Sequence, residues 1–467
     1  MSNADYQIFE DIIQEMMMVY RHDNRPWLIG YSGGKDSTLL VSLVFRAVSR
    51  IPENERNKKV YVITSDTMVE NPIVKKYMHE SSEKISSASK AQKLNIQAEI
   101  IYPDIHQTFW ARVIGLGYPT PEPPGFRWCT ERLKINPMNK FVEECIKTNG
   151  EIIILLGVRK AESAARSRSI SEKEIAGYLL NPHNNINNAY VYNPLTEIEN
   201  SLVWEYLLKD NGISPWGTSM KQLFSLYQGE DLSEEQSVLG EIDEKKIPIT
   251  GNSRFGCWCC TLVKEDKSLQ SFINKGSDEL KPLREFRNWL VSIRQAPDFR
   301  DTKRRNGTVY TKSNGEIGFG PFTLEARRII LKRLLELQKE TQMQLITIDE
   351  LKVIDEMWDA DGDLERRHLV DTYYDVMGER LPWDEYKVPM YHPEIVGEIE
   401  QIARKYNLEP ELMEKLIVSV DKNKHYTRSN VIKKEVTRII NQEWLHQDSF
   451  IIWFSNKMQI FAYTPIL

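Results

Sequence analysis

The sequence has 467 residues and a mass of 54.5 kDa, which is room for roughly two or three domains of ordinary size. With 61 Lys and Arg against 67 Asp and Glu, the net charge is −6, which excludes a uniformly basic nucleic-acid coat. Five cysteines exclude a disulfide scaffold, and three of them within four positions indicate a reducing compartment and a metal or redox site. Because we find neither a signal-peptide pattern nor a long apolar run, we expect a cytoplasmic protein that does not bind a membrane.

Strand-like and helix-like segments alternate in the first part of the chain. A helix is expected near the N-terminus, within residues 1–25. Short apolar or β-branched runs then predict strands, and longer stretches with helical spacing separate them. The strands are expected at 27–31, 60–64, 96–101 and 151–157, and the helices at 36–49 and 71–93. This alternation predicts an α/β fold, an open parallel sheet with helices on both faces.

The rest of the chain is less regular. A Pro- and Gly-rich loop covers 115–125, an acidic polar stretch covers 229–253, and a basic stretch follows the cysteines. Helical periodicity returns after Thr323, with helices expected at 393–406, 409–420 and 428–443. We therefore predict an α/β domain at 1–215, a cysteine-bearing and basic insertion at 216–320, and a helical C-terminal domain at 321–467.

A short polar loop joins the first strand to the next helix. Glycines allow a tight turn there, and the helix N-terminus offers N–H groups to an anion. Lysine and serine side chains could add contacts to phosphate oxygens. The candidate phosphate-binding residues are Ser32, Gly33, Gly34, Lys35, Asp36 and Ser37. The spacing is neither that of a Walker A loop nor of a dinucleotide fingerprint, and a simple Gly-Gly turn is the alternative.

The segment SGGKDS resembles the PP-loop of the ATP pyrophosphatases, which cleave ATP between its α and β phosphates. The resemblance implies that residues 32–37 hold the pyrophosphate, with Lys35 and Asp36 in the catalytic centre. It also implies that Asp66, at the end of the next strand, contacts the adenosine. A plain turn residue is the alternative for Asp66.

Two further segments carry charged side chains to the expected ligand edge. In FRWCTERLK (126–134), Arg127 and Lys134 suit a phosphate or sulfate, and Cys129 is either a thiol near the reactive centre or a small buried residue. This segment resembles one in the sulfonucleotide reductases.

The other segment follows the strand at 151–157 and begins at Gly157. Its Arg159 can reach a phosphate from the strand end. The resemblance implies that Gly157, Arg159 and Glu162 belong to the nucleotide or substrate pocket, whereas a surface ion pair with Arg166 is the alternative for Glu162.

The cysteine cluster reads FGCWCCT at 255–261. Cys257 and Cys260 form a CxxC pair with Cys259 between them, and thiolates at this spacing can ligate one metal or cluster. Incidental buried cysteines are the alternative.

Taken in order, segments between residues 25 and 335 resemble the DndC-like sulfurtransferases of bacterial DNA phosphorothioation. That resemblance implies ATP and Mg²⁺ as cofactors, DNA as substrate, and as partners a cysteine desulfurase and the other subunits of a phosphorothioation complex. It also implies an iron–sulfur cluster on four cysteines. This sequence departs from the pattern because 229–253 has no cysteine and Thr250 stands where one is expected, so Cys129, Cys257, Cys259 and Cys260 are the remaining candidate ligands.

The function expected from these features is ATP-dependent transfer of sulfur to a DNA backbone phosphate, with Cys257 and Cys260 receiving or delivering the sulfur. A cluster-free persulfide relay is the alternative to an iron–sulfur centre. Three other functions stay open: a phosphoadenylyl-sulfate reductase, which the absence of cysteine after Cys260 disfavours, a tRNA thiolase, and an ATP-binding scaffold of a DNA-modification or defence complex.

The net negative charge requires a local DNA-binding patch. The best candidate is a basic stretch whose members are Arg284, Arg287, Arg300, Lys303, Arg304 and Arg305. A solvated charged face is the alternative interpretation.

Overall fold

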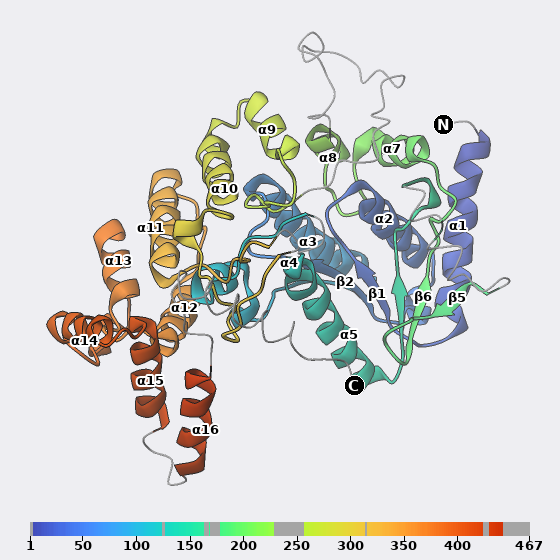
Figure 1. The fold of residues 1–467 in the computed structure, drawn as a ribbon. Helices are drawn as coiled ribbons and strands as arrows, with labels where there is room; N and C mark the ends of the chain where they lie inside the picture. The colour runs from blue at the N-terminus through green and yellow to red at the C-terminus, as the bar shows by residue number, and fades with distance from the viewer. Residues whose placement is uncertain are drawn as a thin grey trace. The chain divides into compact units, whose positions relative to one another are not determined.

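The computed structural model describes residues 3–123, 127–162, 168, 178–227, 256–312, 315–423 and 429–441. The chain divides into two compact units. The first unit contains residues 1–104 and 121–287, and the second contains 105–120 and 288–467. Figure 1 follows the chain from blue to red through both units.

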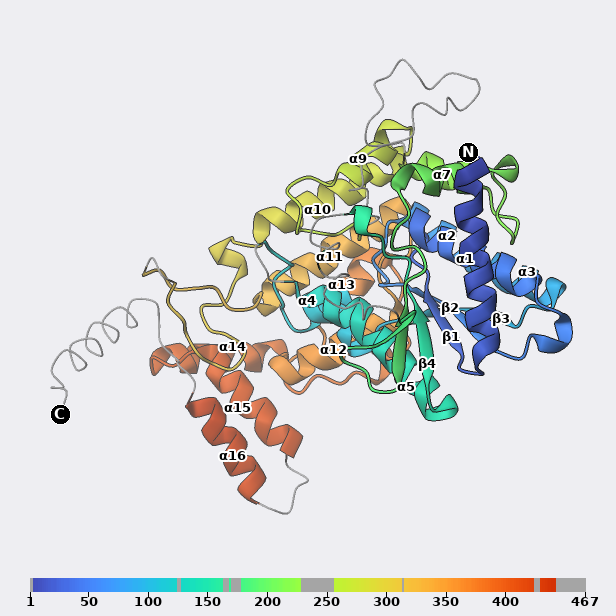
Figure 2. The ribbon, with the colours of Figure 1, turned by 90° about the vertical axis from the view of Figure 1, so that its right-hand side faces the viewer.

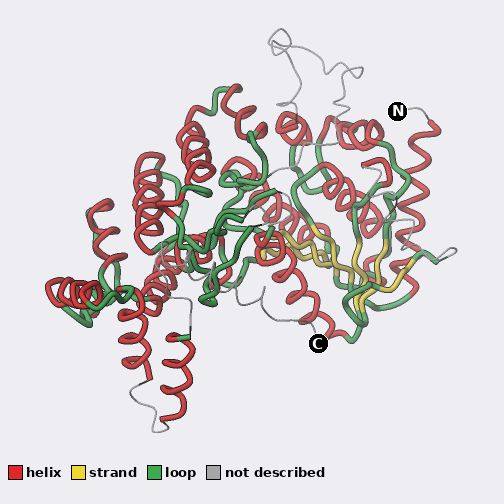
Figure 3. Tube along the Cα trace, viewed as in Figure 1, coloured by secondary structure: helices red, strands yellow, loops and turns green. Residues whose placement is uncertain are grey.

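A six-stranded sheet forms the centre of the first unit within the described residues, in the order β3-β2-β1-β4-β6-β5. The strands are β1 (Trp27–Gly30), β2 (Val60–Ser65), β3 (Ile96–Ile101), β4 (Ile152–Leu155), β5 (Leu180–Pro182) and β6 (Ala189–Tyr192). All pairings are parallel except that of β5 with β6. The yellow strands of Figure 3 lie together in this one sheet.

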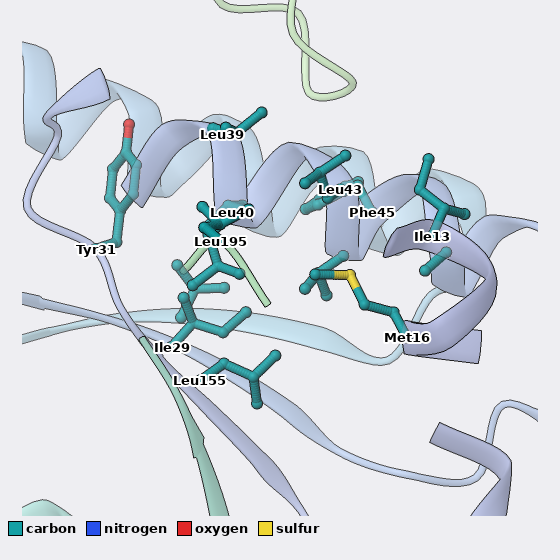
Figure 4. Packing of buried hydrophobic residues seen from close by; sticks show 14 of the residues in the cluster. Ile13, Met16, Ile29, Tyr31, Leu39, Leu40, Leu43, Phe45, Leu155 and Leu195 are labelled. Atoms are coloured by element: carbon teal, nitrogen blue, oxygen red, sulfur yellow. The ribbon is translucent and has the colours of Figure 1, made fainter. Parts of the chain in front are cut away.

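Helices cover both faces of the sheet, as side-chain burial requires for parallel strands. On one face, α1 (Asn3–His22), α2 (Lys35–Ser49), α3 (Pro72–Gln92), α7 (Asn200–Leu208) and α8 (Met220–Tyr227) supply a continuous apolar core. Figure 4 shows Leu40 of α2 and Leu195 lying over Ile29 and Leu155 of the sheet.

The opposite face is covered by α5 (Asn136–Asn149), whose Val142 and Cys145 pack on Leu28, Ile63 and Ile154. Figure 2 shows the strands edge-on beside α1 and α5. Cys145 is therefore a core residue of this layer, remote in sequence and packing from the clustered cysteines. The remaining helices assigned wholly to the first unit are the short α4 (Trp128–Thr130) and α9 (Lys267–Asn274), and the unit boundary falls inside α10 (Lys281–Ile293).

The second unit is helical in its described part. Its helices are α11 (Leu324–Thr341), α12 (Ile348–Asp361), α13 (His368–Met377), α14 (Pro393–Lys405), α15 (Pro410–Asn423) and α16 (Ser429–Ile440). Residues 105–120 are inserted here from the middle of the first unit's sequence. The indole of Trp110 donates to the Leu345 carbonyl at 2.9 Å, and Trp358 donates to the Ile114 carbonyl at 2.8 Å.

The predicted α/β class, the four predicted strands and the helical C-terminal region are confirmed. The antiparallel edge strand β5 was not predicted, so the sheet is mixed. The two compact units group 105–120 with the C-terminal helices and 256–287 with the first unit, so their boundaries differ from those of the three expected segments. Within the described residues, no helix is long and apolar enough to cross a membrane.

Candidate active site

Three adjacent parallel strands, β1, β2 and β4, end at one edge of the sheet. The segments that leave this edge begin at Tyr31, Asp66 and Leu156. Ligands of open α/β sheets bind outside such carboxyl ends. The fold therefore brings together the loop at 32–37, the turn at 66–71 and the segment that carries Gly157 and Arg159.

The loop at 32–37 is shaped for close approach by a ligand. Gly33 has a φ of +70°, and a β-carbon there would lie 2.8 Å from Met78 Cγ, so a larger residue would be strained. Ser32 and Ser37 face each other, with 3.2 Å between their hydroxyl oxygens. The Ser37 hydroxyl also donates to the Gly34 carbonyl at 3.0 Å. The glycines and serines thus hold a tight turn at the start of α2.

Lys35 is the first residue of α2 and is only 6% exposed. Its ammonium lies 3.4 Å from Asp36 Oδ2 and 5.4 Å from the centre of the Tyr227 ring. The Lys35 backbone N–H donates to the Tyr227 hydroxyl at 3.0 Å. Burial raises the pKa of Tyr227, so the hydroxyl is neutral and sits where a phosphate oxygen could accept the same N–H.

Asp36 is held from the other side by Arg159, which is 1% exposed. The Arg159 guanidinium donates to Asp36 Oδ1 at 2.7 Å and to the Ile198 carbonyl at 3.0 Å. Gly157 allows this approach, since a β-carbon there would lie 3.0 Å from the Asp36 carbonyl oxygen. Two buried cations and one partly exposed carboxylate therefore lie behind the loop, which gives it a local positive charge suited to an anionic ligand.

Asp66 is fully buried, and both of its carboxylate oxygens have partners. Oδ1 accepts from the Met68 N–H at 2.7 Å, and Oδ2 lies 2.9 Å from His79 Nε2 and 3.4 Å from Lys75 Nζ. These contacts shape the turn between β2 and α3, in which Met68 has a φ of 67°. Asp66 thus acts as a turn residue, which was the alternative interpretation. Contact between Asp66 and adenosine stays a prediction.

The cysteine segment docks on this same turn. Cys257 and Glu70 form an antiparallel bridge, and the Trp258 N–H donates to the Val69 carbonyl at 3.1 Å. The Cys257 sulfur lies 3.7 Å from the Thr67 hydroxyl, which contacts Glu70 Oε1 at 3.0 Å. Thiol, hydroxyl and carboxylate therefore form a chain along which a proton can leave the sulfur.

Lys134 completes this chain, because its ammonium lies 3.2 Å from Glu70 Oε1. Burial would lower the pKa of Lys134, but the Glu70 carboxylate and the Cys257 sulfur outweigh that effect and raise it. Burial and the Glu70 carboxylate raise the pKa of Cys257, while Lys134 acts in the opposite direction. Cys257 is therefore a neutral thiol at rest, and Lys134 stabilises its thiolate when the proton leaves.

The other clustered cysteines lie near Cys257. Burial raises the pKa of Cys129, with a further contribution from Cys260, and raises that of Cys259, which is fully buried. No three His, Cys, Asp or Glu side chains among the described residues are arranged to hold a metal ion. The iron–sulfur ligand set of Cys129, Cys257, Cys259 and Cys260 therefore stays a prediction.

Several predicted residues lie elsewhere or outside the described part. Arg127 is exposed beside Cys129, the Glu162 side chain is not described, and Thr250 and the acidic stretch lie outside the described residues. Arg166 does too, so the proposed pair with Glu162 is untested.

Three members of the predicted DNA-binding stretch, Arg287, Arg300 and Lys303, are buried. Arg287 is 1% exposed and donates to the Cys260 carbonyl at 2.8 Å, while Arg300 is 8% exposed and donates to the Gly320 carbonyl at 2.9 Å. Arg287 belongs to the first unit and Arg300 to the second. Their main visible role is structural, because each guanidinium binds backbone carbonyl groups.

Three residues of the site were not singled out from the sequence: Thr67, Glu70 and Tyr227. Thr67 and Glu70 belong to the segment SDTMVENP (65–72), so a signal for them was present beside Asp66. Tyr227 is 192 positions from the Lys35 amide to which it is bonded, and no local pattern could have indicated it.

Comparison with known families adds to this geometry. Residues 26–263, just over half of the chain, match the model of the phosphoadenosine phosphosulfate reductase domain. The chain belongs to this family. The matched region of the phosphoadenosine phosphosulfate reductase domain contains the loop at 32–37 and every clustered cysteine, and it places the chain in the PP-loop ATP pyrophosphatase superfamily.

One curated relative, an uncharacterized protein of Methanocaldococcus jannaschii, is 26% identical over 148 residues, which are 32% of this chain and 26% of the relative. The chain thus matches about a quarter of that relative's length.

Three solved structures resemble the domain at low TM-scores, too low to carry an argument. A phosphoadenylyl-sulfate reductase from Candida auris in a phosphate complex is 13% identical and has a TM-score of 0.27, covering 48% of this chain and 91% of its own. An ammonia-dependent NAD synthetase from Campylobacter jejuni is 17% identical with a TM-score of 0.29, covering 49% and 83%. A U34-tRNA thiolase from Methanococcus maripaludis with its 4Fe–4S cluster is 17% identical with a TM-score of 0.26, covering 46% and 71%.

Proposed function

We propose that this protein is an ATP pyrophosphatase and sulfurtransferase that exchanges a non-bridging oxygen of a DNA backbone phosphate for sulfur. The proposal rests on two groups of residues that follow adjacent strands of the sheet. A phosphate loop with Lys35, Asp36 and Arg159 follows β1, and the Cys257 thiol docks on the turn that follows β2. Membership of the phosphoadenosine phosphosulfate reductase domain family also supports sulfur chemistry that depends on an adenine nucleotide.

The phosphate oxygen of DNA is a poor leaving group and must first be activated. In the proposed first step this oxygen attacks the α-phosphorus of ATP, the bond from that phosphorus to the bridging oxygen breaks, and pyrophosphate leaves. Lys35 and the N–H groups at the start of α2 bind the pyrophosphate and stabilise its developing charge. Mg²⁺, when bound with the nucleotide, would neutralise further phosphate charge.

In the proposed second step, a persulfide on Cys257 supplies the sulfur. A cysteine desulfurase loads this sulfur, and the Cys257 proton passes through Thr67 toward Glu70 during loading. The terminal sulfur attacks the activated phosphorus and AMP leaves with the former phosphate oxygen. Cys260 then attacks the Cys257 sulfur, which forms a disulfide and releases the phosphorothioate with the electron pair. A thiol reductant restores both thiols.

The decisive experiment compares two cysteine variants in the presence of ATP, DNA and a cysteine desulfurase. Cys257→Ser is expected to release pyrophosphate at a rate near that of the wild type but to incorporate no sulfur into DNA. Cys145→Ser, at a core cysteine of α5, is the matched control and is expected to incorporate sulfur. Sulfur incorporation by Cys257→Ser would contradict the proposed carrier, and wild-type protein that releases pyrophosphate without modifying DNA would contradict the proposed acceptor.

A sulfonucleotide reductase is the second candidate, because the family model that matches residues 26–263 carries that description. In that reaction a cysteine would attack the sulfur of the sulfonucleotide, and a second thiol would release sulfite. Incubation of the reduced protein with phosphoadenylyl sulfate separates the two candidates. Sulfite release without ATP would favour the reductase over the proposed sulfurtransferase.

A further inference from the structure

A large charged pocket lies wholly within the second unit. It has a volume of about 1020 Å³ and is lined by residues of the 300–305 loop, the start of α11, and helices α15 and α16. Pockets that hold small ligands commonly have volumes of roughly 300–1000 Å³, so this one is far larger than a single phosphate ion needs. Neither the phosphate loop nor the clustered cysteines contribute to it.

The charge of the lining is strongly uneven. Nine Lys or Arg residues line the pocket against five Asp or Glu residues, although the chain as a whole carries a net charge of −6. Local concentration of one sign of charge focuses the electric field and attracts a ligand of the opposite sign. The lining therefore favours an anionic ligand.

Three of the five lining carboxylates already have cationic partners. Asp361 lies 2.8 Å from Arg327 and 3.3 Å from Arg305, and Glu411 lies 3.4 Å from Lys303. Glu435 lies 2.6 Å from Arg438. These pairs reduce the negative charge that the lining presents to a ligand.

Five lining cations are exposed. Arg305 pairs with Asp361 and Arg438 with Glu435, and we call the other three, Arg304, Lys422 and Lys434, the rim cations. In the described part of the chain, none of them has a carboxylate within ion-pair distance. The Arg304 guanidinium lies over the Tyr310 ring, 4.0 Å from its centre. The rim cations come from a loop and two different helices, so they do not follow one helix face.

Apolar side chains lie between the cations. Val418 of α15 and Val431 and Ile439 of α16 line the pocket beside Lys422 and Lys434. A lining of cations separated by apolar surface suits a strand in which phosphates alternate with sugars and bases. An inorganic anion would use only the cations.

We propose that this pocket binds the phosphodiester backbone of a nucleic acid strand, with Arg304, Lys422 and Lys434 contacting its phosphates. The inference rests on the proposed function in that DNA is the polymer to be held. It places the DNA-binding site in the second unit, where Arg300, Lys303 and Arg305 of the predicted basic stretch also line the pocket.

Glu414 also lines the pocket. Burial, together with Glu411 and Glu400, raises the pKa of Glu414 to about 7, and Lys415 opposes this shift. Glu414 is therefore partly protonated at neutral pH. A neutral carboxyl group repels a phosphate less than a carboxylate does, which is consistent with an anion site.

The test measures binding of the full chain to a labelled DNA duplex of about 20 base pairs, without ATP, over a series of salt concentrations. The triple variant Arg304→Glu, Lys422→Glu and Lys434→Glu is expected to bind at least about tenfold more weakly, with a salt slope lower by about 2 to 3. The matched control carries Lys332→Glu, Lys352→Glu and Lys433→Glu, three exposed lysines outside the pocket. It has the same charge change and is expected to lose less than about threefold.

Equal losses in both triple variants, or no loss in the rim variant, would overturn the inference. Polyglutamate that competes with DNA at equal charge concentration would also overturn it, because the pocket would then take an acidic protein. Single-stranded DNA and RNA of the same length, tested in parallel, identify the preferred strand.

The same binding assay separates this inference from the proposed function. Lys35→Ala is expected to bind DNA like the wild type while releasing no pyrophosphate. Wild-type protein that binds DNA through the rim cations but transfers no sulfur would contradict the proposed function. It would not contradict the assignment of the pocket.

Discussion

The reactivity of Cys257 is set by two neighbours of opposite charge. Burial raises the pKa of the thiol, Glu70 raises it further and Lys134 lowers it, while the two charges are themselves paired at 3.2 Å. Glu70→Gln is therefore expected to lower the pKa of Cys257, and Lys134→Met to raise it further. Alkylation of Cys257 by iodoacetamide at pH 8, followed by mass spectrometry, should be faster in the first variant and slower in the second.

Cys145 supplies an internal control in the same digests. Burial raises its pKa to about 11, and it packs against the sheet on α5, so its slow alkylation should be unchanged. If both variants changed the alkylation rate of Cys257 in the same direction, access to the thiol rather than charge would govern its reactivity.

The pair of Asp36 and Arg159 joins the phosphate loop to the end of β4. Arg159→Met is expected to lower the free energy of unfolding by about 2–4 kcal/mol, since it leaves a largely buried carboxylate with one cationic partner fewer. Adding Asp36→Asn should restore part of this loss. Urea unfolding of the two single variants and the double variant measures the coupling.

The exposed pair of Glu400 and Arg404 on α14 is the matched control. Arg404→Met should cost less than about 0.5 kcal/mol, because water screens this pair. A loss of the same size in Arg159→Met would show that the Asp36 pair is no stronger than a surface contact.

The chemistry of single residues was only partly predictable. Lys35, Asp36 and Cys257 stand in short local patterns, so the sequence indicated them. Glu70 and Tyr227 act through contacts with residues 64 or more positions away, Lys134 and Lys35, and such contacts are created only when the sheet forms. Asp66 was indicated correctly as a residue at a strand end, but its burial against His79 could not be predicted from its own position.

Among the secondary-structure elements, α15 contains the clearest pH-sensitive group. The raised pKa of Glu414 means that the folded protein holds this proton more tightly than the unfolded chain does. The stabilising effect is complete below the ordinary pKa of about 4.5 and is lost as the pH rises through about 7. Glu414→Gln should therefore remove roughly 1–3 kcal/mol of pH dependence between these limits.

Urea unfolding at a series of pH values, followed by circular dichroism at the helix band, measures this effect. Glu394→Gln, at an exposed position on α14, is the control and should retain the wild-type profile. A Glu414→Gln profile that kept the wild-type slope would assign the pH dependence to other groups.

Elements with strong periodicity were predicted well. The strand at 96–101 and the helix starts near 35, 72 and 393 follow directly from β-branched runs and helical spacing. Strand β5 was missed because it has three residues and ends in Pro182, which pattern analysis assigns to a loop. The placement of 105–120 was missed because its buried partners lie more than 200 positions further along.

At the scale of the molecule, the family match from 26 to 263 crosses from one compact unit into the other and back. Trp110 lies inside the matched region but is fully buried in the second unit. Trp110→Ala is expected to destabilise that unit by about 3–5 kcal/mol. Hydrogen exchange of the full chain should increase in α11 and α12 and stay unchanged in β1 and β2.

Trp204→Ala is the matched control, because Trp204 of α7 is 1% exposed and packs on Phe224 within the first unit. Its exchange should increase in α2 and α8 instead. An increase in β1 and β2 with none in α12 for Trp110→Ala would contradict the assignment of 105–120 to the second unit.

The insertion of 105–120 also affects when this segment can fold during protein synthesis. The indole bonds of Trp110 to Leu345 and of Trp358 to Ile114 span 235 and 244 positions. A ribosome that adds about 5–20 residues per second needs roughly 10–50 s to synthesise that intervening chain. For most of this interval Trp110 and Ile114 have left the ribosome but cannot yet be buried by Leu345 and Trp358, so the nascent protein exposes an apolar segment that chaperones can shield.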